Sequence, residues 1–157
     1  MGYQATHHYP IRAELPRWLV VGFIAGFLSV LVFHQGAVAL LHALEFTPRA
    51  PFSLEPTRPL GVPVLTSLAF WGGVWGVLLA ATFPRMDGAR LIVAATVFGA
   101  IFPTLVAWFI VAPLKGQPMA AGFAPAAMMI GPIVNAAWGL GAGIGLALFG
   151  RARSVRS

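Results

Sequence analysis

The 157-residue chain contains no cysteine and very few charged residues. Without cysteine it can form no disulfide, no thiol nucleophile and no cysteine-ligated zinc or iron–sulfur site. Only 9% of the residues are charged, whereas a soluble domain carries about 25%. Among the charged residues the acidic ones are fewer, with four Asp and Glu against ten Lys and Arg. These shortages exclude an ordinary soluble domain, which needs a charged surface to face water.

Apolar residues make up 59% of the chain and lie in long runs. The clearest run is GPIVNAAWGLGAGIGLALFG, from Gly131 to Gly150, in which Asn135 is the only strongly polar side chain. An α-helix needs about 20 apolar residues to cross the ~30 Å hydrocarbon core of a bilayer. This run therefore predicts a transmembrane helix.

Four such runs predict an all-α fold, a single integral membrane bundle of four transmembrane helices. The expected spans cover residues 18–44, 64–83, 91–112 and 123–150. Proline lies inside the last two, and Pro103 predicts a kink because it lacks the N–H that would bond to the carbonyl of Gly99. Five prolines between Glu45 and Pro63 exclude a helix there and favour stiff, extended backbone. This segment is either a folded cap over one end of the bundle or a flexible tether.

Glycine pairs spaced four residues apart occur in three of the four expected spans. Such pairs let the backbones of two membrane helices approach closely. The predicted helix-packing glycines are Gly22 and Gly26, Gly72 and Gly76, and Gly139 and Gly143, with Gly141 and Gly145 as a further pair. Trp18, at the start of the first span, fits the aromatic belt at a membrane interface.

The second and fourth spans resemble each other when the chain is shifted by 67 residues. Six identities then occur within positions 69–80: Ala69, Trp71, Gly72, Gly76, Leu79 and Ala80 align with Ala136, Trp138, Gly139, Gly143, Leu146 and Ala147. The first and third spans match at a shift of 73, for example Gly26 with Gly99. One interpretation is two duplicated parallel helical hairpins related by a pseudo-twofold axis along the membrane normal. The other is chance similarity among spans rich in Gly, Ala and Leu.

The basic residues flank the apolar runs and divide unequally between the two expected sides. Seven lie on one side (Arg12, Arg17, Arg85, Arg90, Arg151, Arg153 and Arg156) and three on the other (Arg49, Arg58 and Lys115). The positive-inside rule then predicts a multi-pass protein of the bacterial inner membrane with both termini in the cytoplasm. The net charge of +6 suits anionic lipid headgroups. We therefore expect the lipid bilayer as a partner and no nucleic acid.

Several polar side chains fall at similar depths within the expected spans. At 1.5 Å per residue, His34 lies ~24 Å from the cytoplasmic end of its span, Asn135 ~22 Å, Thr104 ~21 Å and Ser67 ~27 Å. We expect these four, together with Gln35, to meet inside the bundle. The cluster is either a set of structural hydrogen bonds that fixes helix register or a small polar cavity that binds a ligand, a quinone headgroup or an ion.

No pattern typical of a catalytic site occurs. The chain has no Walker loop, no HExxH motif and no nucleophile elbow. His34 and His42 lie on the same span, so they cannot ligate a haem from opposite sides, and His42 with Glu45 offers too few ligands for a metal. We therefore expect a protein that is not an enzyme, with no cofactor, no metal and no catalytic residue.

The segments FHQGAVALLH, PFSLEPTRPLGVP and LAFWGGVWG resemble short four-span inner-membrane proteins of bacteria whose activity is uncharacterised. The resemblance implies a bacterial origin and four spans, and it supplies no site residues. Two functional hypotheses follow from the residues themselves. The first is a non-catalytic accessory or assembly subunit that packs against other membrane subunits or copies of itself. The second is a small transport or ligand-binding protein that uses the polar layer around His34 and Asn135.

Overall fold

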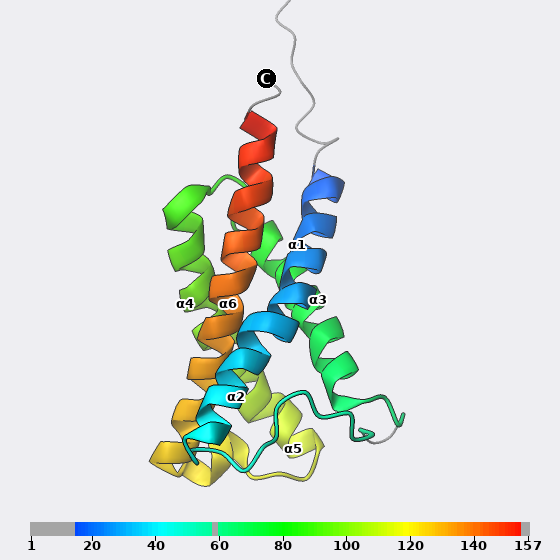
Figure 1. The fold of residues 1–157 in the computed structure, drawn as a ribbon, viewed down its shortest axis with the longest axis vertical. Helices are drawn as coiled ribbons and strands as arrows, with labels where there is room; N and C mark the ends of the chain where they lie inside the picture. The colour runs from blue at the N-terminus through cyan, green and yellow to red at the C-terminus, as the bar shows by residue number, and fades with distance from the viewer. Residues whose placement is uncertain (1–14, 58–59, 155–157) are drawn as a thin grey trace, which may run out of the picture.

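A computed structural model describes residues 15–57 and 60–154 of the chain, with side chains through Phe149. Four helices in this part are long and apolar enough to cross a membrane: Leu15–Ala43, Val64–Thr82, Gly88–Leu114 and Pro125–Phe149. They stand side by side as a bundle (Figure 1), and no strand forms among the described residues. The predicted all-α four-helix fold is thus confirmed, with helix ends within a few residues of the expected ones.

The first membrane helix contains a π-helical turn at its middle. It consists of α1 (Leu15–Ser29), the π-helical segment η2 (Val30–His34) and α2 (Gln35–Ala43), which follow one another without a break. A π-turn accommodates one extra residue in a helix and changes the direction in which the following side chains point. His34 and Gln35 lie directly at this change of register.

The third membrane helix is interrupted in the same way, but not at its proline. It consists of α4 (Gly88–Val106), the π-helical segment η3 (Ala107–Val111) and the short α5 (Ala112–Leu114). Pro103 lies within α4, so the helix continues beyond the proline and its irregular turn comes four residues later.

The second and fourth membrane helices have no such interruption. They are α3 (Val64–Thr82) and α6 (Pro125–Ser154), and α6 is preceded by the short 3-10 turn η4 (Met119–Phe123). Pro132 lies inside α6, which continues through it.

The helices form two hairpins that meet along one edge. α1 packs along α3, α4 packs along α6, and α1 joins the two hairpins by packing against α6. α3 and α4 barely touch, although only a short connection separates them in the sequence. Aromatic rings lie between them instead, with the ring centroids of Trp75 and Phe98 6.0 Å apart and those of Phe83 and Phe98 6.2 Å apart. α1 and α6 therefore pack together on one side of the bundle, whereas on the other side only aromatic side chains lie between α3 and α4. We call this second side the open α3–α4 side.

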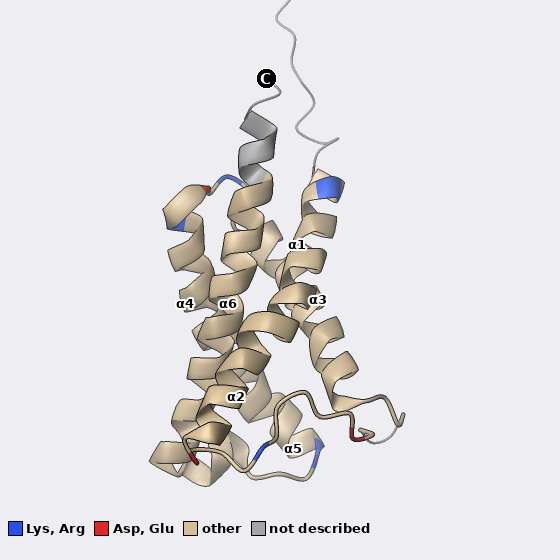
Figure 2. Ribbon diagram, in the orientation of Figure 1, with Lys and Arg blue, Asp and Glu red and all other residues tan. Residues whose placement is uncertain are grey.

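Charged side chains lie at the two ends of the bundle and leave its middle uncharged (Figure 2). One end, which we call the arginine end, holds the first turn of α1, with Arg17, and the connection from α3 to the first turn of α4, with Arg85 and Arg90. The last turns of α6 lie at the same end (Figure 1). The other end, which we call the loop end, holds the connection between α2 and α3, with Glu45, Arg49 and Glu55, and the turn after α5, with Lys115. Of the remaining basic residues in the predicted grouping, Arg12, Arg58 and Arg156 lie outside the described residues.

Candidate functional site

The α1–α3 hairpin is built on a backbone contact between glycines. Gly22 and Gly26 of α1 face Gly72 and Gly76 of α3. A Cβ atom added at Gly26 would overlap the carbonyl oxygen of Gly72, and one added at Gly76 would overlap that of Gly22. Only glycine allows the two main chains to come this close, so these four glycines set the spacing of the hairpin.

The α4–α6 hairpin has the same kind of contact with one fewer glycine. A Cβ atom added at Gly139 of α6 would overlap the carbonyl oxygen of Ala95 on α4, and one at Gly99 would overlap that of Asn135. A Cβ at Gly143 would lie 2.8 Å from that of Ala95. All six predicted packing glycines therefore lie at helix–helix contacts.

The α1–α3 contact and the α4–α6 contact correspond position by position. The shift that relates them differs, however, from the 67 residues at which the sequences of the second and fourth spans match. Gly76 meets Gly22 as Gly139 meets Ala95, so that α1 maps onto α4 with a shift of 73 and α3 maps onto α6 with a shift of 63. The second shift is four residues, about one helical turn, shorter than the 67 of the sequence match. The partner of Trp138 in this correspondence is Trp75 rather than Trp71.

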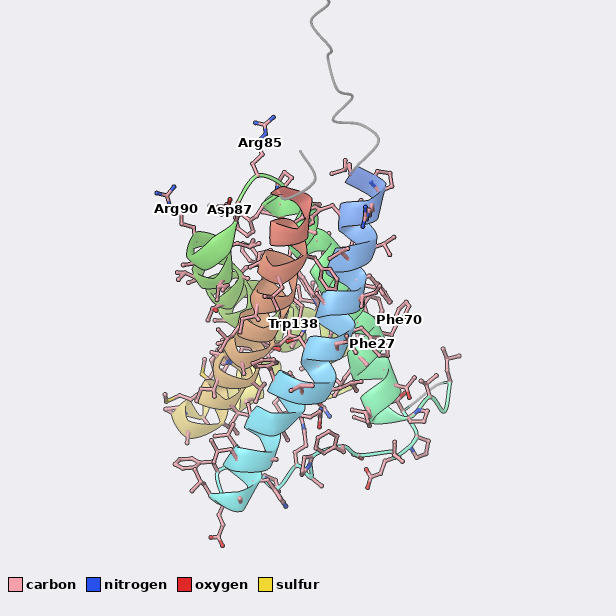
Figure 3. All side chains as sticks on the ribbon, turned by 45° about the horizontal axis from the view of Figure 1, so that its top comes forward. Phe27, Phe70, Arg85, Asp87, Arg90 and Trp138 are labelled. Atoms are coloured by element: carbon pink, nitrogen blue, oxygen red, sulfur yellow. The ribbon has the colours of Figure 1, made fainter. Side chains whose placement is uncertain are left out.

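Trp138 joins the two hairpins. Its indole Nε1 donates a hydrogen bond to the carbonyl of Gly26 over 2.9 Å, and its own carbonyl accepts one from the Ser29 hydroxyl over 2.6 Å. The side chain is only 2% exposed and lies between α1 and α6 near mid-height (Figure 3). Ser29 is not among the residues predicted from the sequence. Its hydroxyl lies about one turn after Gly26 on the same helix face, and this position could have indicated a bond to the packed helix.

Trp18 makes a similar bond within the first hairpin. Its Nε1 donates to the carbonyl of Ala80 over 3.1 Å, and the ring is buried. Trp18 is therefore at the end of the bundle, as expected, but it packs inward rather than standing in an interfacial belt.

Two of the five predicted polar side chains meet between α4 and α6. The Asn135 amide Nδ2 donates to Thr104 Oγ1 over 2.9 Å, and Thr104 is fully buried. This bond joins the two helices of the α4–α6 hairpin, about one turn along α4 from Gly99.

Another two meet at the π-turn of the first helix, where both are buried. Gln35 Nε2 lies 3.4 Å from His34 Nδ1, and Gln35 Oε1 accepts a hydrogen bond from the backbone N–H of Phe52 over 2.7 Å. Within the described residues no hydrogen bond joins this pair to Thr104 and Asn135, and none includes the Ser67 side chain, which is half-buried. The structure thus divides the predicted cluster into two separate pairs.

The proline-rich segment folds against both helices that it joins, and Gln35 holds it through the hydrogen bond from Phe52. His42 Nδ1 lies 3.0 Å from the carbonyl of Thr47. At the start of α3, the N–H groups of Val64 and Leu65 donate to the carbonyls of Glu55 and Ser53 over 2.9 and 3.0 Å. Because the first N–H groups of a helix have no partner within it, the segment caps α3 as well as the end of α2.

Replacing Gln35 by Met is expected to release this segment locally. The variant keeps the volume of the side chain but loses the acceptor for Phe52, and a hydrogen bond of this kind is worth about 1 kcal/mol. Amide hydrogen exchange at Phe52 should accelerate about fivefold. Gln117→Met, at an exposed glutamine between α5 and η4, should leave it unchanged; equal exchange in wild type and Gln35→Met would show that the bond does not hold the segment.

The buried polar side chains of the described residues are all paired within the protein. Within the same residues no three His, Asp or Glu side chains cluster, and each buried side-chain nitrogen or oxygen has a hydrogen-bond partner in the protein. Comparison with known proteins finds no family model, no curated protein and no solved structure that matches the chain.

Proposed function

We propose that the protein is a non-catalytic accessory or assembly subunit of the bacterial inner membrane, which packs against another membrane subunit or a second copy of itself. The observation that carries the proposal is the open α3–α4 side. α3 is packed closely only along α1, and α4 only along α6. Between them lies an apolar aromatic surface that ends in Phe102. The centroid of its ring lies 4.9 Å from that of Phe98, with the two rings tilted by 38°, yet Phe102 is 51% exposed.

The hydrogen-bond partners of the buried polar groups support the same role. Ser29, Gln35 and Asn135 bond to neighbouring helices or to the proline-rich segment. Their hydrogen bonds fix the shape of the protein and leave the contact surface apolar, as expected for a subunit that acts by packing. The arginine end carries the larger share of the basic residues, and the positive-inside rule places it, with both termini, in the cytoplasm.

Phe102→Ala tests the role of the open side. We expect it to weaken association, measured as the fraction of oligomer or co-purified subunit in native mass spectrometry after gentle detergent extraction, by roughly tenfold, because truncating an aromatic anchor in an interface costs ~1–2 kcal/mol. The matched control is Phe109→Ala, since Phe109 is similarly exposed at 47% and lies on the same membrane helix. A monomer in wild type, or equal loss in both variants, contradicts the proposal.

The alternative role, transport or ligand binding at the outer half, is favoured by one observation. His34 ends a π-helical turn, and such turns occur frequently at functional sites. Under this alternative, wild type is a monomer whose melting temperature rises with one small solute. His34→Leu would then abolish that rise while leaving insertion and folding normal.

A further inference from the structure

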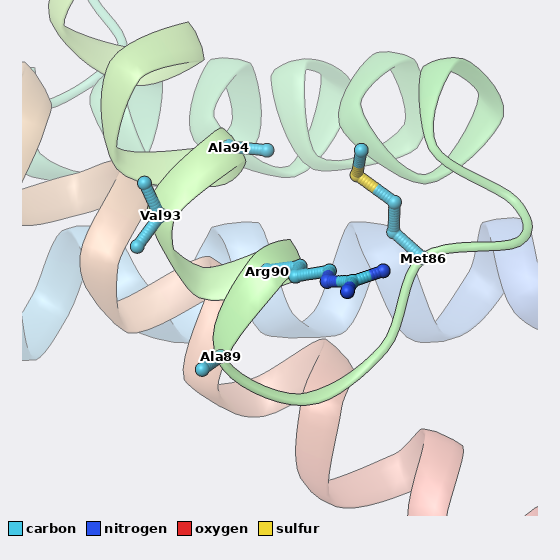
Figure 4. Close-up of a pocket in the computed structure, with 5 residues that line it drawn as sticks. All are labelled: Met86, Ala89, Arg90, Val93 and Ala94. Carbon is cyan, nitrogen blue, oxygen red and sulfur yellow. The ribbon is translucent and has the colours of Figure 1, made fainter.

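Two hollows open beside α4 at the arginine end. The larger has a volume of about 440 Å³ and is lined by Met86, Ala89, Arg90, Val93 and Ala94 (Figure 4). It is a shallow depression that is open along the side of α4, not an enclosed cavity. The smaller, about 260 Å³, lies between α4 and α6 and has no charged residue in its lining (Gly88, Ala89, Ile92, Ile144, Ala147 and Leu148).

The larger hollow combines an apolar wall with a cation at its edge. Met86, Val93 and Ala94 form the wall, and the Arg90 side chain extends across it toward Met86 (Figure 4). Arg85 projects from the adjoining connection, with Asp87 between the two arginines (Figure 3). Among the described side chains, the hollow therefore has the two positive charges of Arg85 and Arg90 and the negative charge of Asp87 beside a surface suited to hydrocarbon.

An amphiphile with a negative headgroup fits this arrangement. The wall faces outward from a bundle whose sides are apolar, so that a hydrocarbon chain can lie along α4 in the hollow. A headgroup phosphate would then lie at the arginine end, within reach of Arg90 and Arg85. Guanidinium groups bind phosphate with paired hydrogen bonds.

We propose that this hollow binds an anionic phospholipid, with an acyl chain against Val93 and Ala94 and the phosphate held by Arg90. A zwitterionic lipid offers the same chain without the net charge. A free phosphate offers the charge but leaves the apolar wall uncovered. The proposal goes beyond the assembly role and does not depend on it.

The headgroup part is tested with delipidated protein in a neutral detergent, by native mass spectrometry with added phosphatidylglycerol or phosphatidylcholine. We expect wild type to retain phosphatidylglycerol preferentially. Arg90→Gln should weaken this binding about fivefold, the effect of one cation near a membrane surface. Arg17→Gln is the matched control, because Arg17 lies at the same end on α1 and is absent from the lining.

The chain part is tested by filling the hollow. Val93→Trp should abolish selective retention, whereas Val97→Trp, one turn further along α4 and outside the lining, should leave it intact. Equal retention of both lipids, or equal effects of Arg17→Gln and Arg90→Gln, would overturn the proposal. So would a rise in melting temperature with inorganic phosphate as large as that with phosphatidylglycerol, because the site would then bind the anion alone.

Discussion

Gly76→Ala is expected to destabilise the protein by about 3 kcal/mol, at the upper end of the range for overpacking a close contact. The added methyl group would overlap the Gly22 carbonyl oxygen and approach the Cα of Gly26. Both obstacles are backbone atoms, so neither can move aside as a flexible side chain would. The loss should appear as a lower melting temperature and as a lower midpoint of denaturant unfolding in detergent.

The same substitution at Gly36 should act in the opposite direction. Gly36 also lies in the first membrane helix, but nothing lies within 4 Å of a Cβ built there. Alanine is favoured over glycine in a helix by up to ~1 kcal/mol, so Gly36→Ala should leave stability unchanged or raise it. A Gly76→Ala variant as stable as Gly36→Ala would show that the α1–α3 backbones do not meet as described.

Trp138→Ala is expected to cost about 3–5 kcal/mol, the usual loss for a large aromatic removed from a core. The change would leave a void between α1 and α6 and remove the donor to the Gly26 carbonyl. Because this side chain belongs to α6 and lies against Gly26 and Gly72 of the first hairpin, the loss should fall on the joint between the hairpins. Trp138→Phe, which keeps most of the volume but not the N–H, should lose less.

Trp71→Ala is the control, because Trp71 is 57% exposed and contacts the neighbouring Phe70 ring edge-to-face. We expect a loss of about 1 kcal/mol, the value of one aromatic pair. Chemical unfolding followed by circular dichroism measures both. Equal losses at Trp71 and Trp138 would refute the assignment of Trp138 as the residue that joins the two halves.

The four helices could be predicted from the sequence because bilayer thickness fixes how long each apolar run must be. The packing glycines could be predicted because spacing along one helix shows which small residues share a face. The register between the hairpins could not. Trp71-Gly72 and Trp75-Gly76 are one turn apart on the same helix, so both can align with Trp138-Gly139, and only the contacts select the second pair.

The candidate polar cluster shows what a depth estimate leaves out. Counting residues along a helix gives the height of a side chain but not the direction in which it points. The expected heights of His34 and Asn135 agree, yet Gln35, directly after the π-turn, bonds to Phe52 of the proline-rich segment, and Asn135 bonds across to Thr104. The sequence gives no sign of η2, because no proline marks that turn.

The pairing of helices has a consequence for biosynthesis. The closest contacts of glycine with the backbone of another helix, those of α1 with α3 and of α4 with α6, join spans that are consecutive in the chain. The first hairpin therefore has both its helices by Thr82, before α4 has been translated. Trp138, whose indole joins the two hairpins, belongs to α6, the fourth of the membrane helices described. A nascent chain that stops short of Trp138 therefore contains a complete first hairpin but not the hydrogen bonds that fasten it to the second. The helices can therefore insert two at a time, and the two hairpins become joined by these hydrogen bonds only once α6 is in place.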